Sequence, residues 1–194
     1  MRVALTNLFQ SMDFNVEVFS SAAELLESEL PNIASCLVLD IRMPGVNGLE
    51  FQQALAKTGV NVPIVFMTGH GDIPMSVKAM KAGAVDFLQK PFRDQDMLDA
   101  VTRALDQDRK RRDGEQAASK LRLLFDSLTR REREVLALVT SGLMNKQIAH
   151  QLEVSEITVK IHRGNVMKKM EARSFADLVR MAETLGIRRP KTQT

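Results

Sequence analysis

Asp40, Thr68 and Lys90 are chemically complementary side chains, and each stands at the end of a short apolar run in the first half of the chain. A carboxylate in such a position can cap a helix, bind a metal ion or act as a nucleophile. A nearby hydroxyl and a nearby ammonium group can compensate the charge on phosphate oxygens. The combination is typical of an aspartate that accepts a phosphoryl group, and a cis peptide bond before Pro91 would turn Lys90 back over it.

The elements that must position these residues alternate between two periods over the first hundred residues. Runs rich in β-branched or aromatic residues predict strands at 14–19, 36–40, 63–67 and 84–89. Capped amphipathic stretches predict helices at 22–29, 48–57, 73–82 and 95–105. This alternation is typical of an α/β fold with a doubly wound parallel sheet, in which ligands meet the carboxyl ends of the strands. Asp40, Thr68 and Lys90 should therefore meet at one edge of the sheet.

The last third of the chain has only helical patterns. Thr129 and Glu132 match a capping box. We expect helices at 130–140, 146–152, 156–170 and 175–185. Four short helices predict a small all-α bundle.

The distribution of charge separates the chain into three segments. Residues 1–104 carry 8 Lys/Arg and 12 Asp/Glu (−4), residues 105–127 carry 6 and 5 (+1), and residues 128–194 carry 13 and 7 (+6). An acidic first part and a basic last part suggest different partners, with nucleic acid the first candidate for the basic part. We therefore expect a domain at 1–104, a charged, helical or partly mobile linker at 105–127 and a second domain at 128–194.

The stretches LVLDIRMPGVNGLE and IVFMTGHGDIPMSVKAMKAGAVDFLQKPF resemble the receiver domain of bacterial two-component response regulators of the FixJ and NarL type. The resemblance implies a flavodoxin-like (CheY-like) fold. It also implies that a sensor histidine kinase phosphorylates Asp40, with Mg²⁺ bridging the transferred group. Thr68 and Phe87 would form a switch pair, with Lys90 and Pro91 beside the phosphate.

The same resemblance leaves the metal site incomplete. Asp40 and the backbone carbonyl of Arg42 match ligand positions, whereas the position of His70 is one that tunes dephosphorylation. Receivers begin with a central strand that ends in an acidic, Mg²⁺-binding pair, but this chain opens with MRVALTNLF, which matches the middle of the first helix. We therefore expect an N-terminally truncated receiver, poorly folded and weak in Mg²⁺ binding, and a reading frame that extends upstream of Met1.

Residues 128–184 resemble the LuxR-type helix-turn-helix over their whole length. In the expected helix at 156–170, an apolar face should pack in the core, and a second face is free to enter a major groove. On this second face, Lys160 would contact guanine, Ile161 a thymine methyl group, and Gly164 would allow close approach.

Phosphate contacts suit the remaining polar residues of this region. The candidates are Lys146, Thr158 and Lys168. Arg163 lies at the margin and could contact either a base or a phosphate. His162 matches a family position, although a packed residue at the helix edge is the simpler interpretation. Met144 replaces the usual Ser or Thr cap, so Asn145 is expected to cap its helix.

These features predict a DNA-binding transcription regulator and not an enzyme. Its expected partners are DNA, a sensor histidine kinase and a second copy of the chain, with RNA polymerase as a further candidate. The alternative is a phosphorylation-independent regulator whose degenerate receiver serves for dimerisation. A flavin carrier or enzyme of the same fold is disfavoured, because the chain has no phosphate-cradling Gly-rich loop, no Trp and no Tyr.

No apolar run approaches the roughly 20 residues that a membrane span needs. We expect a cytoplasmic protein that does not bind a membrane. The single cysteine, Cys36, excludes an internal disulfide and is interpreted as a buried core residue.

Overall fold

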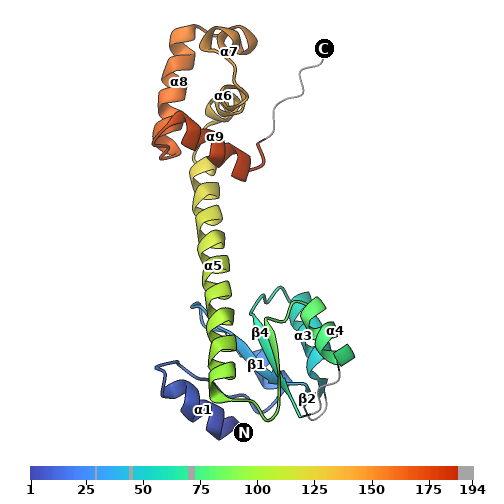
Figure 1. Ribbon diagram of the computed structural model, residues 1–194. Helices are drawn as coiled ribbons and strands as arrows, with labels where there is room; N and C mark the ends of the chain where they lie inside the picture. Colours follow the sequence, from blue (N-terminus) through green and yellow to red (C-terminus); the bar gives the residue numbers. More distant parts are fainter. Residues whose placement is uncertain (29, 44–45, 70–72, 188–194) are drawn as a thin grey trace. The chain divides into compact units, whose positions relative to one another are not determined.

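A computed structural model describes residues 1–28, 30–43, 46–69 and 73–187 of the 194-residue chain. The chain divides into two compact units, Met1–Arg112 and Asp113–Thr194. The first is an α/β unit, and the regular elements described in the second are all helices (Figure 1). Among the described residues, no helix is both long enough and apolar enough to cross a membrane.

A parallel sheet of three strands forms the centre of the first unit. Its strands are β1 (Leu37–Asp40), β4 (Ile64–Thr68) and β5 (Asp86–Gln89), in the order β1-β4-β5. The register pairs Asp40 with Met67 and Thr68 with Gln89, so the carboxyl ends of all three strands lie at one edge. Two antiparallel strands of two residues each, β2 (Arg42–Met43) and β3 (Val46–Asn47), follow β1. They were not expected from the sequence.

Helices cover both faces of this sheet (Figure 1). They are α1 (Arg2–Gln10), α2 (Ala22–Glu27), α3 (Gly48–Lys57), α4 (Ile73–Lys81) and the first part of α5 (Asp94–Asp126). Ile64 and Phe66 of β4 pack in one core with α2, α3 and α4, whereas Val65 and Met67 pack in another with α1 and α5. The doubly wound architecture is therefore confirmed.

One expected strand is wrong. Residues 14–19 have no regular secondary structure, although their alternating apolar pattern is typical of a strand. An extended segment becomes a strand only when its backbone groups pair with a neighbouring strand. Within the described residues, β1 has one paired neighbour in the sheet, β4, so no partner strand is present for residues 14–19.

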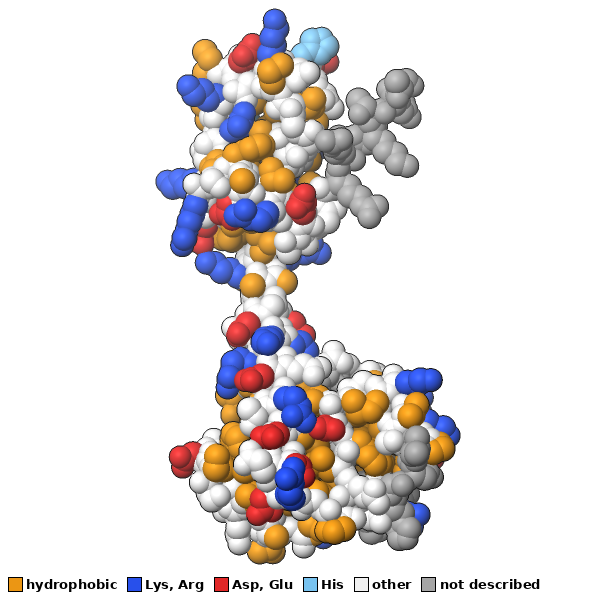
Figure 2. Space-filling view, in the orientation of Figure 1, with side chains coloured by type: hydrophobic (Ala, Val, Ile, Leu, Met, Phe, Trp, Pro, Cys, Tyr) orange, Lys and Arg blue, Asp and Glu red, His pale blue; other side chains and the backbone are white. Residues whose placement is uncertain are grey.

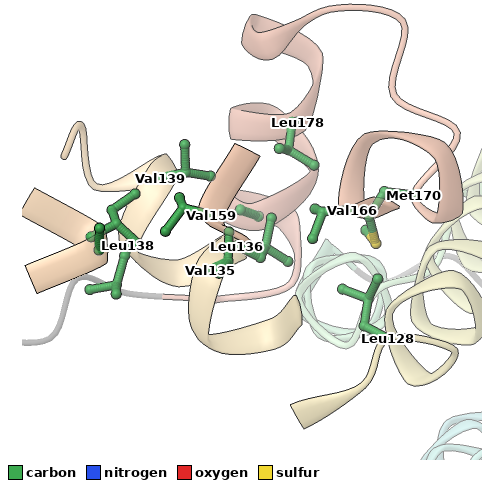
Figure 3. Packing of buried hydrophobic residues seen from close by; sticks show 12 residues of the cluster. Leu128, Val135, Leu136, Leu138, Val139, Val159, Val166, Met170 and Leu178 are labelled. Carbon is green, nitrogen blue, oxygen red and sulfur yellow. The ribbon is translucent and has the colours of Figure 1, made fainter. Parts of the chain in front are cut away.

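The second unit packs four short helices and the end of α5 around one core (Figure 3). The short helices are α6 (Arg130–Thr140), α7 (Asn145–Leu152), α8 (Glu156–Lys169) and α9 (Phe175–Thr184). The expected capping box at Thr129 and Glu132 begins α6. Val135 and Leu136 of α6, Val159 and Val166 of α8, and Leu178 of α9 are all fully or almost fully buried.

The segment expected as a linker is helical as far as Asp126, because α5 continues through it. Leu121, Leu124 and Phe125, near the end of α5, pack against the core of the second unit. The stretch before them contains a buried carboxylate, Asp108, which the sequence analysis did not single out.

Asp108 ties α5 to the segment that precedes β1. Its Oδ2 atom accepts hydrogen bonds from the backbone N–H of Ser35 at 3.0 Å and from Arg112 Nε at 2.7 Å. Its Oδ1 atom accepts two from Arg111, from Nε at 3.1 Å and from Nη2 at 2.6 Å, and Arg112 also donates to Asn32 at 2.9 Å. Burial acts to raise the pKa of Asp108, but these hydrogen bonds outweigh it and hold the pKa below its ordinary value.

We predict that Asp108→Ala lowers the unfolding free energy of the first unit by about 3 to 5 kcal/mol, because it leaves two guanidinium groups and the Ser35 N–H without their acceptor. Asp106→Ala is the matched control on the same helix, since its ion pair with Arg109 is exposed and should contribute less than about 1 kcal/mol. Hydrogen exchange of the β1 amides, followed by mass spectrometry, measures both effects.

The sign of the pH dependence follows from the lowered pKa. The stabilisation by Asp108 is complete above the unfolded-state pKa of about 3.9 and is lost as the pH falls through the lower folded-state value. Equal exchange rates in the two variants at pH 7 would show that Asp108 contributes no stability.

Candidate functional site

Asp40 and Lys90 are in direct contact at the carboxyl edge of the sheet. Lys90 Nζ donates to Asp40 Oδ2 at 2.6 Å, and the backbone N–H of Arg42 donates to Asp40 Oδ1 at 3.1 Å. The Asp40 side chain keeps 32% of its surface exposed, against 19% for Lys90. The Lys90–Pro91 peptide bond is cis. The site therefore presents a carboxylate that is already paired with a cation and is still open to solvent.

Thr68 and Phe87 lie on the two strands next to this pair. Thr68 is fully buried, and its backbone carbonyl accepts the N–H of Lys90 at 2.7 Å. Phe87 is half-buried, lies opposite Phe66 in the register and packs against the core formed with α2, α3 and α4. We refer to Asp40, Thr68 and Lys90 as the Asp40 site.

The residues that the structure describes do not fit the expected Mg²⁺ site. Mg²⁺ requires an octahedral set of oxygen ligands. No group of three or more His, Cys, Asp or Glu side chains that could hold a metal occurs among the described residues. Both Asp40 oxygens already accept hydrogen bonds, one from Lys90 and one from the backbone N–H of Arg42. His70, expected to tune dephosphorylation, lies outside the described residues.

In the second unit, α8 has the two expected faces. Val159, Val166 and Met170, just after its end, are fully buried. The exposed face carries Lys160, Ile161, Gly164 and Lys168. Lys and Arg side chains gather on the α8 side of this unit (Figure 2). We refer to these four exposed residues as the α8 face; Lys146 is exposed on α7.

Gly164 has no packing role within the protein. A Cβ atom at this position would meet no other atom within 4 Å. Glycine inside a helix destabilises the helix by about 1 kcal/mol relative to alanine. The packing of the protein therefore gives no reason for a glycine at this position.

Arg163 is engaged inside the protein. Its Nη1 atom donates to Asn145 Oδ1 at 2.6 Å, and its guanidinium carbon lies 5.7 Å from the centre of the Phe175 ring, within the range of a cation–π contact. The half-buried Arg163 therefore connects α7, α8 and the start of α9. Asn145 is the first residue of α7 and not its cap, so that expectation is wrong: Met144 is the N-cap, and its N–H donates to Gln147.

Thr158 and His162 also have local roles. The N–H of Thr158 donates to Ser155 Oγ at 3.1 Å, as part of the N-cap of α8, and the two hydroxyls lie 2.8 Å apart. His162 is half-buried, and its Nδ1 atom is buried without a hydrogen-bond partner among the described residues. Of the expected contact residues on α8, Thr158 and Arg163 are thus used by the protein itself.

Sequence reasoning missed Ile157, in the first turn of α8. Its side chain is 73% exposed, more than that of Ile161 at 58%. Its spacing of four residues from Ile161 was the available signal, because residues at i and i+4 share a helix face.

Comparison with known proteins agrees with this geometry. Residues 1–102 match the response regulator receiver domain, and residues 126–182 match the bacterial regulatory proteins of the luxR family. Nodulation protein W of Bradyrhizobium diazoefficiens is 59% identical over 96% of this chain and 82% of its own. The transcriptional regulatory protein FixJ of Azorhizobium caulinodans is 42% identical over 96% of this chain and 89% of its own.

A solved structure extends the match to both units. The response regulator StyR has 50% sequence identity and a TM-score of 0.86, with 94% of this chain and 92% of that chain covered. FixJ is by its name a transcriptional regulatory protein, and the match at residues 126–182 is to a family of bacterial regulatory proteins. The chain therefore belongs to the two-component response regulators that combine a receiver domain with a LuxR-type DNA-binding domain.

Proposed function

We propose that Asp40 is the phosphoacceptor of this response regulator, and the contact between Lys90 Nζ and Asp40 is the observation that carries the proposal. An Asp40 oxygen attacks the phosphorus of a phosphohistidine on the sensor kinase. The new O–P bond forms as the P–N bond breaks, and the imidazole leaves with the electron pair and takes up a proton. The product is an acyl phosphate on Asp40.

The neighbouring groups act on the phosphate that Asp40 gains. Lys90 gives up its contact with the carboxylate and binds a phosphate oxygen, held in place by the turn at Pro91. The Thr68 hydroxyl donates to another oxygen, and Phe87 repacks behind it. This change is the signal that leaves the site.

The α8 face is the proposed DNA-binding surface. Lys160, Ile161 and Gly164 contact base edges in a major groove, while Lys168 and Lys146 bind phosphates. We also propose a phosphate contact for Thr158, which lies at the start of α8, where its N–H donates to Ser155 Oγ. For Arg163 we propose a positioning role through Asn145, since its guanidinium is already bound within the protein.

The remaining assignments complete the proposal. Residues 1–104 are the receiver, 105–127 the linker and 128–194 the DNA-binding domain. The protein acts in the cytoplasm as a homodimer, so that two copies of α8 fit half-sites about one helical turn apart. RNA polymerase is a further candidate partner. The alternative proposal is a second function, in which the receiver only pairs two copies and needs no phosphorylation.

We predict that Asp40→Asn abolishes labelling of the full chain by a radioactive acyl phosphate, because an amide lacks the nucleophilic oxygen anion. Asp106→Asn, an exposed change on α5, should leave labelling unchanged. Undiminished labelling of Asp40→Asn would place the reaction at another residue. If the unaltered chain takes no label, the phosphorylation-independent function is favoured.

We predict that Lys160→Ala weakens binding to a specific duplex by about 1 to 3 kcal/mol more than binding to random DNA, if Lys160 contacts guanine at two atoms. The specific duplex is one that the full chain selects from a randomised pool. Lys146→Ala is the comparison and should weaken both complexes alike. Equal losses on the two duplexes for Lys160→Ala would contradict a base contact.

We predict that Arg163→Ala weakens specific binding without changing its salt dependence. A residue that neutralises one phosphate contributes about 0.9 to the slope of log K against log salt. Lys146→Ala should lose this amount, whereas Arg163→Ala should keep the full slope. Titration of the selected duplex at several salt concentrations measures both, and a reduced slope in Arg163→Ala would show a direct phosphate contact instead.

A further inference from the structure

A large apolar side chain stands open to solvent in the first turn of α8. Ile157 is 73% exposed and Ile161, one turn further along, is 58% exposed. Single exposed apolar residues are common and need no explanation. Two isoleucines at positions i and i+4 form a continuous apolar strip, which would favour burial against another molecule.

We propose that Ile157 contacts a thymine methyl group in the major groove, next to the one contacted by Ile161, and that the pair thereby sets the sequence that this protein selects. The inference rests on the proposed use of the α8 face for DNA. The first residues of a recognition helix are those that approach base edges, and Ile157 occupies this part of α8. The C5-methyl group of thymine is the apolar feature that the major groove offers.

The surroundings of the strip favour DNA over a protein partner. Lys160 lies between the two isoleucines in sequence, and Lys168 is exposed further along the helix. The centres of protein–protein interfaces are depleted in lysine, whereas a DNA groove is bordered by phosphates. Gly164, with open space where a side chain would stand, follows Ile161 and lets the helix approach the groove.

Helix geometry predicts the spacing of the two thymines. Four residues of helix rise about 6 Å. Base pairs rise about 3.4 Å each, so the two methyl groups should lie about two base-pair steps apart within one half-site. Isoleucine suits this role because branching at Cβ restricts it to essentially one rotamer in a helix.

The test uses the full chain and duplexes that it selects from a randomised pool. Each thymine of a half-site is replaced in turn by deoxyuridine, which keeps the hydrogen-bonding atoms and removes only the methyl group. We expect the affinity to fall about three- to fivefold at two positions that lie about two base-pair steps apart. This is the loss expected when one buried methyl group is removed.

The variants assign each methyl group to a residue. Ile157→Ala should be insensitive to deoxyuridine at one position and Ile161→Ala at the other. Leu123→Ala is the control, because Leu123 is similarly exposed, at 69%, but lies on α5. This variant should still lose affinity when either thymine is replaced by deoxyuridine. Circular dichroism checks that these surface changes leave the fold intact.

The outcomes separate this inference from the proposed function. Selected duplexes that lose no affinity on any deoxyuridine replacement would overturn the thymine contacts and leave DNA binding standing. If Ile157→Ala loses affinity at the same deoxyuridine positions as the unaltered chain, the contact between Ile157 and a thymine methyl group is overturned. Failure to select any duplex would overturn DNA binding and the inference together.

Discussion

The first unit depends on a single strand that must be apolar on both sides. Every residue of β4 is buried, and Val65 and Phe66 are completely enclosed between the two cores. Because β1 and β5 both pair with β4, its position fixes where the sheet ends and hence where Asp40, Thr68 and Lys90 meet. The side chains at the edge of the sheet are polar. Their positions are nevertheless set by hydrophobic packing of the residues that precede Thr68 in β4 by one to four positions.

In the second unit, polar contacts at the margin of the core perform the corresponding task. Glu132 is buried, and it accepts a hydrogen bond from Lys169 at 2.7 Å that joins the start of α6 to the end of α8. Burial opposes ionisation of Glu132, but the contacts with Lys169 and Thr129 prevail and lower its pKa. Arg163 fixes the other side of α8 through Asn145. The direction of the α8 face thus follows from contacts that do not touch DNA.

Local patterns in the sequence were sufficient for what depends on neighbouring residues. The bounds of α3 and α6 and the meeting of Asp40 with Lys90 follow from caps, apolar periods and the parallel-sheet rule. The failures concern distant partners. Residues 14–19 have the pattern of a strand but no strand beside them among the described residues. The burial of Asp108 depends on Ser35, 73 residues away in the sequence, which no local pattern indicates. Similarly, Asn145 is a good cap by type, but Arg163 occupies its oxygen.

The two sites differ in how much must change before they can act. In the proposed reaction, phosphorylation of Asp40 displaces an ammonium group that lies 2.6 Å from its carboxylate, so the Asp40 site begins paired, although it is open to solvent. The α8 face is already exposed, and the contacts that orient it belong to the second unit alone. A ligand can shift an equilibrium only by its differential affinity for two states. On the proposed function, phosphorylation therefore has no DNA-binding surface to build, and its effect on DNA binding comes through the pairing of two copies, where joining two half-site contacts multiplies affinity.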